Sequence, residues 1–278
     1  MSGFSPEWLA LREPVDHRSR DPKLVARVVQ HLAPVSEPRI VDLGCGTGSN
    51  LRALAPQLGP RQSWTLVDYD ARLLTAARDR LLAWADDTTD CRVGVILHKN
   101  GCEIAVRFRQ ADLVRDLDAA LGESADLVTA SALFDLCSIP FIERFAEAIS
   151  SRRAAFYTVL TYNGVQTWQP EHPADEAMRE AFIAHQKTDK GFGASAGPDA
   201  PASLATAFRA VGYTIEEADT PWRLGADDAS LIADLATGFA GAVEETGRID
   251  AKTISDWHRV IRTAAIVGHT DTLALPAV

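Results

Sequence analysis

The feature that most constrains the fold is a glycine-rich turn, Gly44-Cys45-Gly46-Thr47-Gly48, that lies between a short apolar run and a helical pattern. The run Arg39–Leu43 has the length and composition of a buried strand, and residues 50–58 read as a helix. Glycine permits positive φ and lets a ligand approach the backbone without a Cβ in the way. The helix that follows presents unpaired N–H groups and the positive end of its dipole. The sequence therefore predicts a strand, a turn and a helix of an α/β sheet, with a ligand-binding turn.

Short apolar runs and amphipathic segments alternate along much of the remaining chain. The predicted strands include residues 64–68, 125–130, 154–161, 213–218 and 264–268, and the predicted helices include 22–32, 71–84, 140–150 and 201–210. Alternation of this kind is typical of a parallel, doubly wound sheet with helices on both faces.

Three segments depart from the alternation. Residues 91–98 and 102–109 are strand-like and meet at Asn100-Gly101, a strong hairpin signal. Residues 162–200 contain one helical stretch and are too long for a plain connection, which predicts an inserted cap or lid. Residues 227–262 predict a helical insertion. With a helical N-terminal segment at 1–34 and no linker between independent units, we expect one domain over residues 1–278.

The charge and the cysteines narrow the class of protein. The formal net charge of −10 disfavours a nucleic-acid substrate, which calls for clustered Lys and Arg. No stretch has the roughly 18 to 20 apolar residues that span a bilayer, and the N-terminus lacks an apolar signal core, so we expect a cytoplasmic protein without membrane contact. The four cysteines show no metal-ligand spacing, so no metal site is expected.

The spacing of the three glycines helps to distinguish between classes of cofactor. A dinucleotide fingerprint is GxGxxG, whereas this turn is GxGxG, and Asp68 ends the next predicted strand. A carboxylate there accepts hydrogen bonds from a ribose diol with either type of cofactor. An NAD(P)-dependent oxidoreductase is therefore an alternative, but the position of the third glycine disfavours it.

Four motifs together resemble the class I, Rossmann-like methyltransferase superfamily that uses S-adenosylmethionine, here as an uncharacterised bacterial branch. They are Val41-Asp42-Leu43-Gly44-Cys45-Gly46-Thr47-Gly48, Leu66-Val67-Asp68-Tyr69-Asp70, Gln110-Ala111-Asp112-Leu113 and Ala125-Asp126-Leu127-Val128. The resemblance implies a mostly parallel, seven-stranded sheet whose third strand lies at one edge. The strand at about 91–98 would extend that edge, protecting it or forming a homodimer contact.

The resemblance also implies roles for cofactor-binding residues. Asp42 would orient the turn, Asp68 would hold the ribose hydroxyls, and Ser131 would lie near the sulfonium. The remaining expected contacts are the three glycines under the methionine part and the residues around the adenine: Gly44, Gly46, Gly48, Tyr69, Asp112 and Leu113. Ordinary packing for Tyr69 and a turn or cap role for Asp112 are the alternatives, and Asp70 is expected to cap the next helix.

An arginine in the N-terminal segment, Arg18 or Arg20, could pair with the methionine carboxylate, with a surface role as the alternative. Methyl transfer is an in-line displacement that needs a general base only when the nucleophile loses a proton. The candidate catalytic residues are His185, Asp135 and Tyr162, each against a structural or capping alternative.

The acceptor is expected to be a small molecule. After the fourth predicted strand the chain reads Ala130-Ser131-Ala132-Leu133, not the (D/N/S)PP(Y/F/W) motif of many nucleobase and glutamine methylators. The sequence thus predicts a methyltransferase with a small-molecule acceptor. A non-catalytic cofactor-binding protein of the same fold is the remaining alternative.

Overall fold

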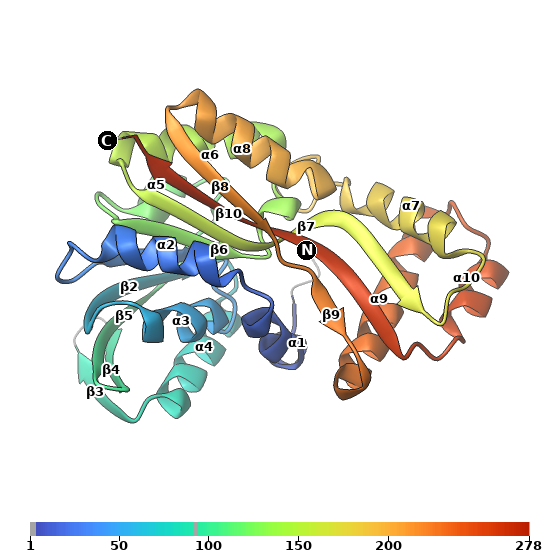
Figure 1. Cartoon of the computed structure of the whole chain (residues 1–278), viewed down its shortest axis with the longest axis horizontal. Coiled ribbons are helices and arrows are strands. Elements are labelled where there is room, and N and C mark those ends of the chain that lie inside the picture. Colours follow the sequence, from blue (N-terminus) through green and yellow to red (C-terminus); the bar gives the residue numbers. More distant parts are fainter. Residues whose placement is uncertain (1–3, 92–93, 278) are drawn as a thin grey trace.

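A computed structural model describes residues 4–91 and 94–277, and within them the strands form one ten-stranded sheet (Figure 1). The order is β3-β4-β5-β2-β1-β6-β7-β10-β8, with β9 paired to β10. The central strands β5, β2, β1, β6 and β7 are mutually parallel, and β10 is antiparallel to β7 and β8. The strands are β1 (Arg39–Leu43), β2 (Arg61–Asp68), β3 (Asp87–Cys91), β4 (Gly94–Lys99), β5 (Cys102–Gln110), β6 (Leu127–Ser131), β7 (Ala155–Gln169), β8 (Tyr213–Asp219), β9 (Trp222–Leu224) and β10 (Ala264–Pro276).

Helices cover both faces of this sheet, as the sequence predicts for a doubly wound fold. One apolar core lies under α2, α3 and α4, and the other lies under α5, α6 and α8. Successive β1 side chains enter opposite cores: Ile40 faces the first, and Val41 faces the second. The helices are α1 (Pro6–Arg18), α2 (Pro22–Leu32), α3 (Ser49–Leu54), α4 (Ala71–Trp84), α5 (Leu117–Leu121), α6 (Ile139–Arg152), α7 (Asp175–Gln186), α8 (Ala200–Ala210), α9 (Ala229–Thr246) and α10 (Ala251–His258), with short 3-10 turns η1 to η4.

The extra hairpin predicted at the sheet edge is present, with different bounds. The strand expected at 91–98 is β4, which pairs antiparallel with β5 from Val95 to Lys99. A further strand, β3, pairs with β4 and forms the outer edge. Residues 92 and 93 of the expected strand lie outside the described residues.

The prediction that the fifth core strand ends near residue 161 is wrong, because β7 continues to Gln169 and remains paired with β10. Along this extension of β7, the side chains of Tyr162, Gln166 and Trp168 are buried, while that of Val165 is exposed. This alternation is that of a strand with one covered face, and α7, α9 and α10 cover it. The extension of β7 together with α7, α9 and α10 is called the cap below. In Figure 1 it lies beside the main sheet.

The N-terminal segment predicted to be helical contains α1 and α2; its residues 1–3 are outside the description. α1 contacts β9 and α9, so it lies between the main sheet and the cap. Over residues 4–91 and 94–277, no helix has the length and apolar character needed to cross a membrane.

Candidate functional site

The glycine turn adopts the backbone conformation that its sequence requires. Gly44, Gly46 and Gly48 have φ values of +61°, +53° and +78°, which lie in the left-handed region that glycine adopts without strain. A Cβ on Gly46 would lie 3.1 Å from Cδ1 of Leu9 in α1. The turn thus follows β1 closely and leads into the N-terminus of α3.

Asp68 stands at the end of β2 beside this turn. Its carboxylate accepts hydrogen bonds from the backbone N–H groups of Gly46 and Asp70, each at 2.9 Å. Burial raises the pKa of Asp68, and these two hydrogen bonds oppose that rise. Asp70 accepts from the backbone N–H of Arg72 and caps α4, which confirms the capping role expected for it.

A buried polar chain lies on the other side of the turn. Asn50 donates to Asp42 Oδ1 at 2.7 Å and to Thr129 Oγ1 at 3.1 Å, and its own side-chain oxygen accepts from Arg20 Nη1 at 2.8 Å. Asp42 is fully buried, its Oδ2 has no partner in the described structure, and burial raises its pKa to about 7. Nε and Nη2 of Arg20 are also buried without a partner there. Two donors of a guanidinium are therefore unused beside the glycine turn.

The other arginine proposed for this role lies elsewhere. Arg18 Nη2 forms an ion pair with Asp228 at 2.6 Å, and the Arg18 side chain is 47% exposed. Arg20 is the member of the pair whose guanidinium reaches the turn. Asn50, which sequence reasoning missed, holds Arg20 and Asp42 together.

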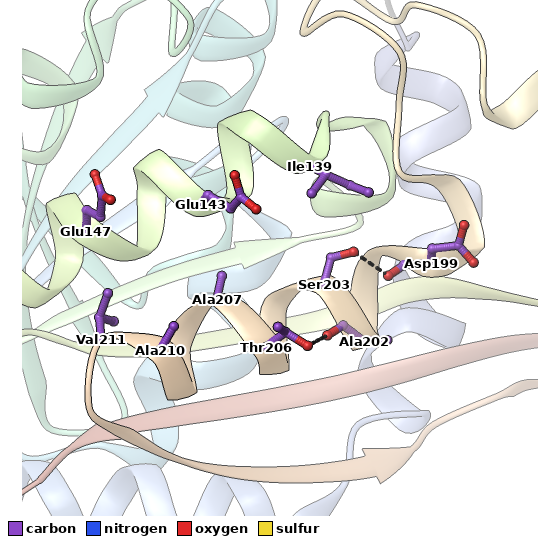
Figure 2. Close-up of a pocket in the computed structure, with 10 residues that line it drawn as sticks. All are labelled: Ile139, Glu143, Glu147, Asp199, Ala202, Ser203, Thr206, Ala207, Ala210 and Val211. Carbon is purple, nitrogen blue, oxygen red and sulfur yellow. Dashed lines mark hydrogen bonds between the residues drawn. The ribbon is translucent and has the colours of Figure 1, made fainter.

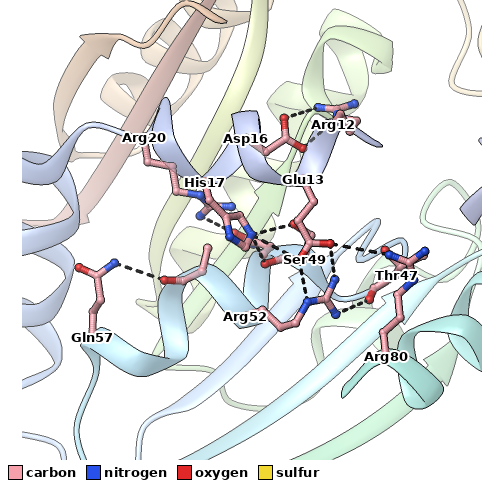
Figure 3. A network of polar contacts seen from close by, with 12 residues as sticks. Arg12, Glu13, Asp16, His17, Arg20, Thr47, Ser49, Arg52, Gln57 and Arg80 are labelled. Atoms are coloured by element: carbon pink, nitrogen blue, oxygen red, sulfur yellow. Dashed lines mark hydrogen bonds and ion pairs between the residues drawn. The ribbon is translucent and has the colours of Figure 1, made fainter. Parts of the chain in front are cut away.

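A network of polar contacts attaches α1 to α3 (Figure 3). The carboxylate of Glu13 accepts from Arg52 Nε at 2.7 Å and from Arg52 Nη2 at 2.6 Å. Arg52 also donates to the carbonyl of Thr47 in the glycine turn, at 2.8 Å. His17 Nε2 lies 2.9 Å from Ser49 Oγ. These contacts hold α1 against the glycine turn and the start of α3.

The residues expected around the adenine follow β2 and β5, and Ser131, expected near the sulfonium, lies at the end of β6. Tyr69 is 58% exposed, so its ring is available for stacking. Asp112 accepts from the backbone N–H of Val114 at 2.9 Å and thus also stabilises a turn, while Leu113 is buried. Ser131 ends β6, the strand adjacent to β1.

Two of the candidate catalytic residues lie together. Asp135, in the turn η2 (Phe134–Leu136), is buried, and its Oδ1 has no partner in the described structure. Burial raises its pKa to about 6, against the influence of the Arg12 charge and the Tyr162 backbone N–H. The Tyr162 hydroxyl is buried and unpartnered, and burial raises its pKa. His185 lies on the cap, where its Nε2 is 3.0 Å from Glu245 Oε2.

An open groove lies between α6 and α8 (Figure 2), away from the residues described so far. Acidic, hydroxyl and small apolar side chains line it: Ile139, Glu143, Glu147, Asp199, Ala202, Ser203, Thr206, Ala207, Ala210 and Val211. It contains no residue of the glycine turn and none of the candidate catalytic residues.

The part of the chain that contains these features matches a known family. Residues 41–164 match the model of a family described as a methyltransferase domain. Over these residues the chain resembles a methyltransferase domain. Members of this family are S-adenosylmethionine-dependent, in agreement with the cofactor expected from the motifs.

Solved structures and one curated protein resemble this chain. The YcgJ protein of Bacillus subtilis superposes with a TM-score of 0.52 and 13% identity, over 94% of this chain and 99% of that chain. A cyclopropane-fatty-acyl-phospholipid synthase-like protein of Lactobacillus casei gives a TM-score of 0.52 and 17% identity, over 96% and 94%. Both support the fold. The biotin biosynthesis bifunctional protein BioCD of Bordetella avium is 46% identical over 57 residues, which are 20% of this chain and only 12% of that protein.

Proposed function

We propose that this protein is an S-adenosylmethionine-dependent methyltransferase that acts on a small molecule. The observation that carries the proposal is the pair of groups flanking the glycine turn. The unused donors of Arg20 lie on one side, and the carboxylate of Asp68 lies on the other. A ligand with a carboxylate at one end and a ribose diol at the other satisfies both. NAD has no free carboxylate to offer Arg20.

The residues of the turn fit this cofactor. Gly44, Gly46 and Gly48 would lie under its methionine part, and Asp42 would orient the turn through Asn50. We place Tyr69, Asp112 and Leu113 around the adenine and Ser131 near the sulfonium, as the motif resemblance implies. Arg20 takes the role for which Arg18 was the other candidate, because Arg18 is already paired with Asp228.

When bound, the cofactor supplies an electrophilic methyl group. The task of the protein is then to align an acceptor with that methyl group and to exclude water. The cap supports this role, since β7 and β10 lead from the main sheet directly into it. Contact with a cap suits a small acceptor, and the net charge of −10 disfavours nucleic acid.

We propose Asp135 and Tyr162 as the residues that contact the acceptor. Both are buried and both carry a polar atom without a partner in the described structure. His185 is the third candidate. Its imidazole contacts Glu245 and Lys190, and its backbone carbonyl accepts a hydrogen bond from the Thr188 hydroxyl. These partners all lie on the cap. It is therefore the weaker candidate of the three.

Calorimetry with S-adenosylhomocysteine and with NAD tests the cofactor assignment. We expect micromolar binding of S-adenosylhomocysteine and none of NAD; the reverse result would overturn the proposal. Incubation with a metabolite extract and isotopically labelled S-adenosylmethionine, followed by mass spectrometry, tests the acceptor class. Label in small molecules is expected, whereas label only in macromolecules would refute a small-molecule acceptor.

A further inference from the structure

Five side chains from five different elements come together between the main sheet and the cap. Tyr162 of β7 and His269 of β10 are directly opposite in the strand pairing, so they share one face of the sheet. The His269 ring centroid lies 5.1 Å from that of Trp222 in β9, and the guanidinium of Arg12 in α1 lies 4.9 Å over the Trp222 ring. The charge of Arg12 acts on the pKa of both His269 and Asp135, and Asp135 lies beside Tyr162. We call these residues the acceptor ring.

The acceptor ring is buried, yet its polar atoms lack partners. Asp135 Oδ1, Tyr162 OH, His269 Nδ1 and Trp222 Nε1 are all buried without a hydrogen bond in the described structure. Leaving one buried polar group unsatisfied costs about 1–3 kcal/mol. A concentration of such groups in one place, next to the methyltransferase domain, indicates a site built for the polar head of a ligand.

The charge of the acceptor ring selects the head group. Arg12 donates to both carboxylate oxygens of Asp16, at 2.9 and 3.3 Å, so its charge is balanced. Burial and the Arg12 charge lower the pKa of His269 to about 3, which leaves the imidazole neutral at physiological pH. Within the acceptor ring, the carboxylate of Asp135 is the remaining charge, and it lies beside Tyr162. A carboxylate beside aromatic faces favours a cation.

We propose that the acceptor ring binds an amine and that the amine nitrogen is the methylated atom; this rests on the proposed function. Asp135 accepts a hydrogen bond from the N–H group and holds the nitrogen toward the donor end of the cofactor site. The bound ammonium first passes one N–H proton to Asp135 Oδ1, which frees the nitrogen lone pair. The lone pair then forms the new N–C bond while the S–C bond pair stays on sulfur, and the product leaves as the N-methylammonium ion. Tyr162 and Trp222 contact the head group and exclude water around it.

Three probes with one aromatic body and different heads test the head-group preference: 2-phenylethylamine, 2-phenylethanol and 3-phenylpropanoate. Binding of S-adenosylhomocysteine is measured first, because its failure would count against the proposed function rather than against this inference. Each probe is then titrated into the protein saturated with S-adenosylhomocysteine. We expect the amine to bind at least about tenfold more tightly than the other two. Equal binding, preference for the alcohol or the acid, or no binding of the amine at millimolar concentration overturns the inference.

Variants test the residue assignment. Asp135→Asn removes the charge at nearly constant shape and should weaken amine binding about tenfold or more while leaving S-adenosylhomocysteine binding intact. Glu143→Gln, in the groove between α6 and α8, is the matched control and should change neither. Unchanged amine binding in Asp135→Asn would refute the role of Asp135. If that variant does not fold, the comparison of the three heads on the unmodified protein still decides the proposal.

Discussion

The guanidinium of Arg20 donates a hydrogen bond to the side-chain oxygen of Asn50 at 2.8 Å. Arg20 lies in the connection between α1 and α2, and this contact places its positive charge beside the glycine turn. In the sequence, α2 and β1 separate Arg20 from that turn. Asn50 in turn donates to Asp42, so the arginine, the amide and the carboxylate are aligned from the N-terminal segment into β1. The position of Arg20 therefore depends on the same residues that shape the turn.

Replacing Arg20 with alanine should weaken binding of S-adenosylhomocysteine by about ten- to a hundredfold, the range of a charge-assisted pair. Arg18→Ala is the matched control and should have little effect, since Arg18 is paired with Asp228. Calorimetry with 5′-methylthioadenosine, which lacks the amino-acid part, separates the cause. Its affinity should be unchanged in Arg20→Ala; an equal loss with both ligands would mean that Arg20 acts on the fold rather than on a carboxylate.

Asp68→Asn should reduce cofactor affinity at least about tenfold, because an amide replaces one carboxylate acceptor with a donor. Asp70→Asn is the control from the same motif. Asparagine caps helices as well as aspartate does, so this variant should retain both affinity and stability. Titration of S-adenosylhomocysteine into the two variants checks this. Similar losses in both would show that the effect is not specific to the end of β2.

Gly46→Ala should both destabilise the protein and weaken cofactor binding. Its φ of +53° is strained for alanine by about 1–2 kcal/mol, and the new Cβ would meet Leu9 at 3.1 Å. Gly101→Ala, at φ +80° and with no neighbouring atom within 4 Å of the new Cβ, carries the strain without the contact. Urea unfolding should show a loss in both variants, whereas calorimetry should show weaker binding only in Gly46→Ala.

Asp42 should make the protein less stable as pH rises. Burial raises its pKa from the usual 3.8 to about 7 in the folded state. Between these values the folded state binds more protons than the unfolded state, so the free energy of unfolding falls with increasing pH. Asp42→Asn should remove up to about 4 kcal/mol of that decline. Urea unfolding of both proteins between about pH 4 and pH 8 measures it; parallel pH profiles would contradict the assignment.

The glycine turn, Asp68 and the parallel core could be predicted because each depends on local sequence. Gly44, Gly46 and Gly48 occupy positions whose positive φ requires glycine, and Asp70 is a helix cap that follows a strand. The extension of β7 was missed, although the alternation of Tyr162, Gln166 and Trp168 with exposed residues was present in the sequence. Pro, Gly and polar residues nearby favoured a loop instead.

Asp135 and Tyr162 were predicted as candidates, but the other three members of the acceptor ring could not be, because they come from distant parts of the chain. Arg12 and His269 meet only after β10 returns beside β7 and α1 packs on β9. A lone histidine in an apolar run carries no local signal of its surroundings. The choice between Arg18 and Arg20 likewise depended on Asp228, a residue more than two hundred positions away.

The shared strands β7 and β10 limit how the molecule can open. Because both strands pass from the central sheet into the cap with their pairing largely continuous, no flexible connection on this path lets the cap swing away as a lid. Opening by that route would break backbone hydrogen bonds of the sheet itself. The element fixed to the site by side chains alone is α1, through Glu13 and Arg52. We therefore expect ligands to exchange most easily when the N-terminal helix is displaced, a movement that would break the Glu13–Arg52 ion pair.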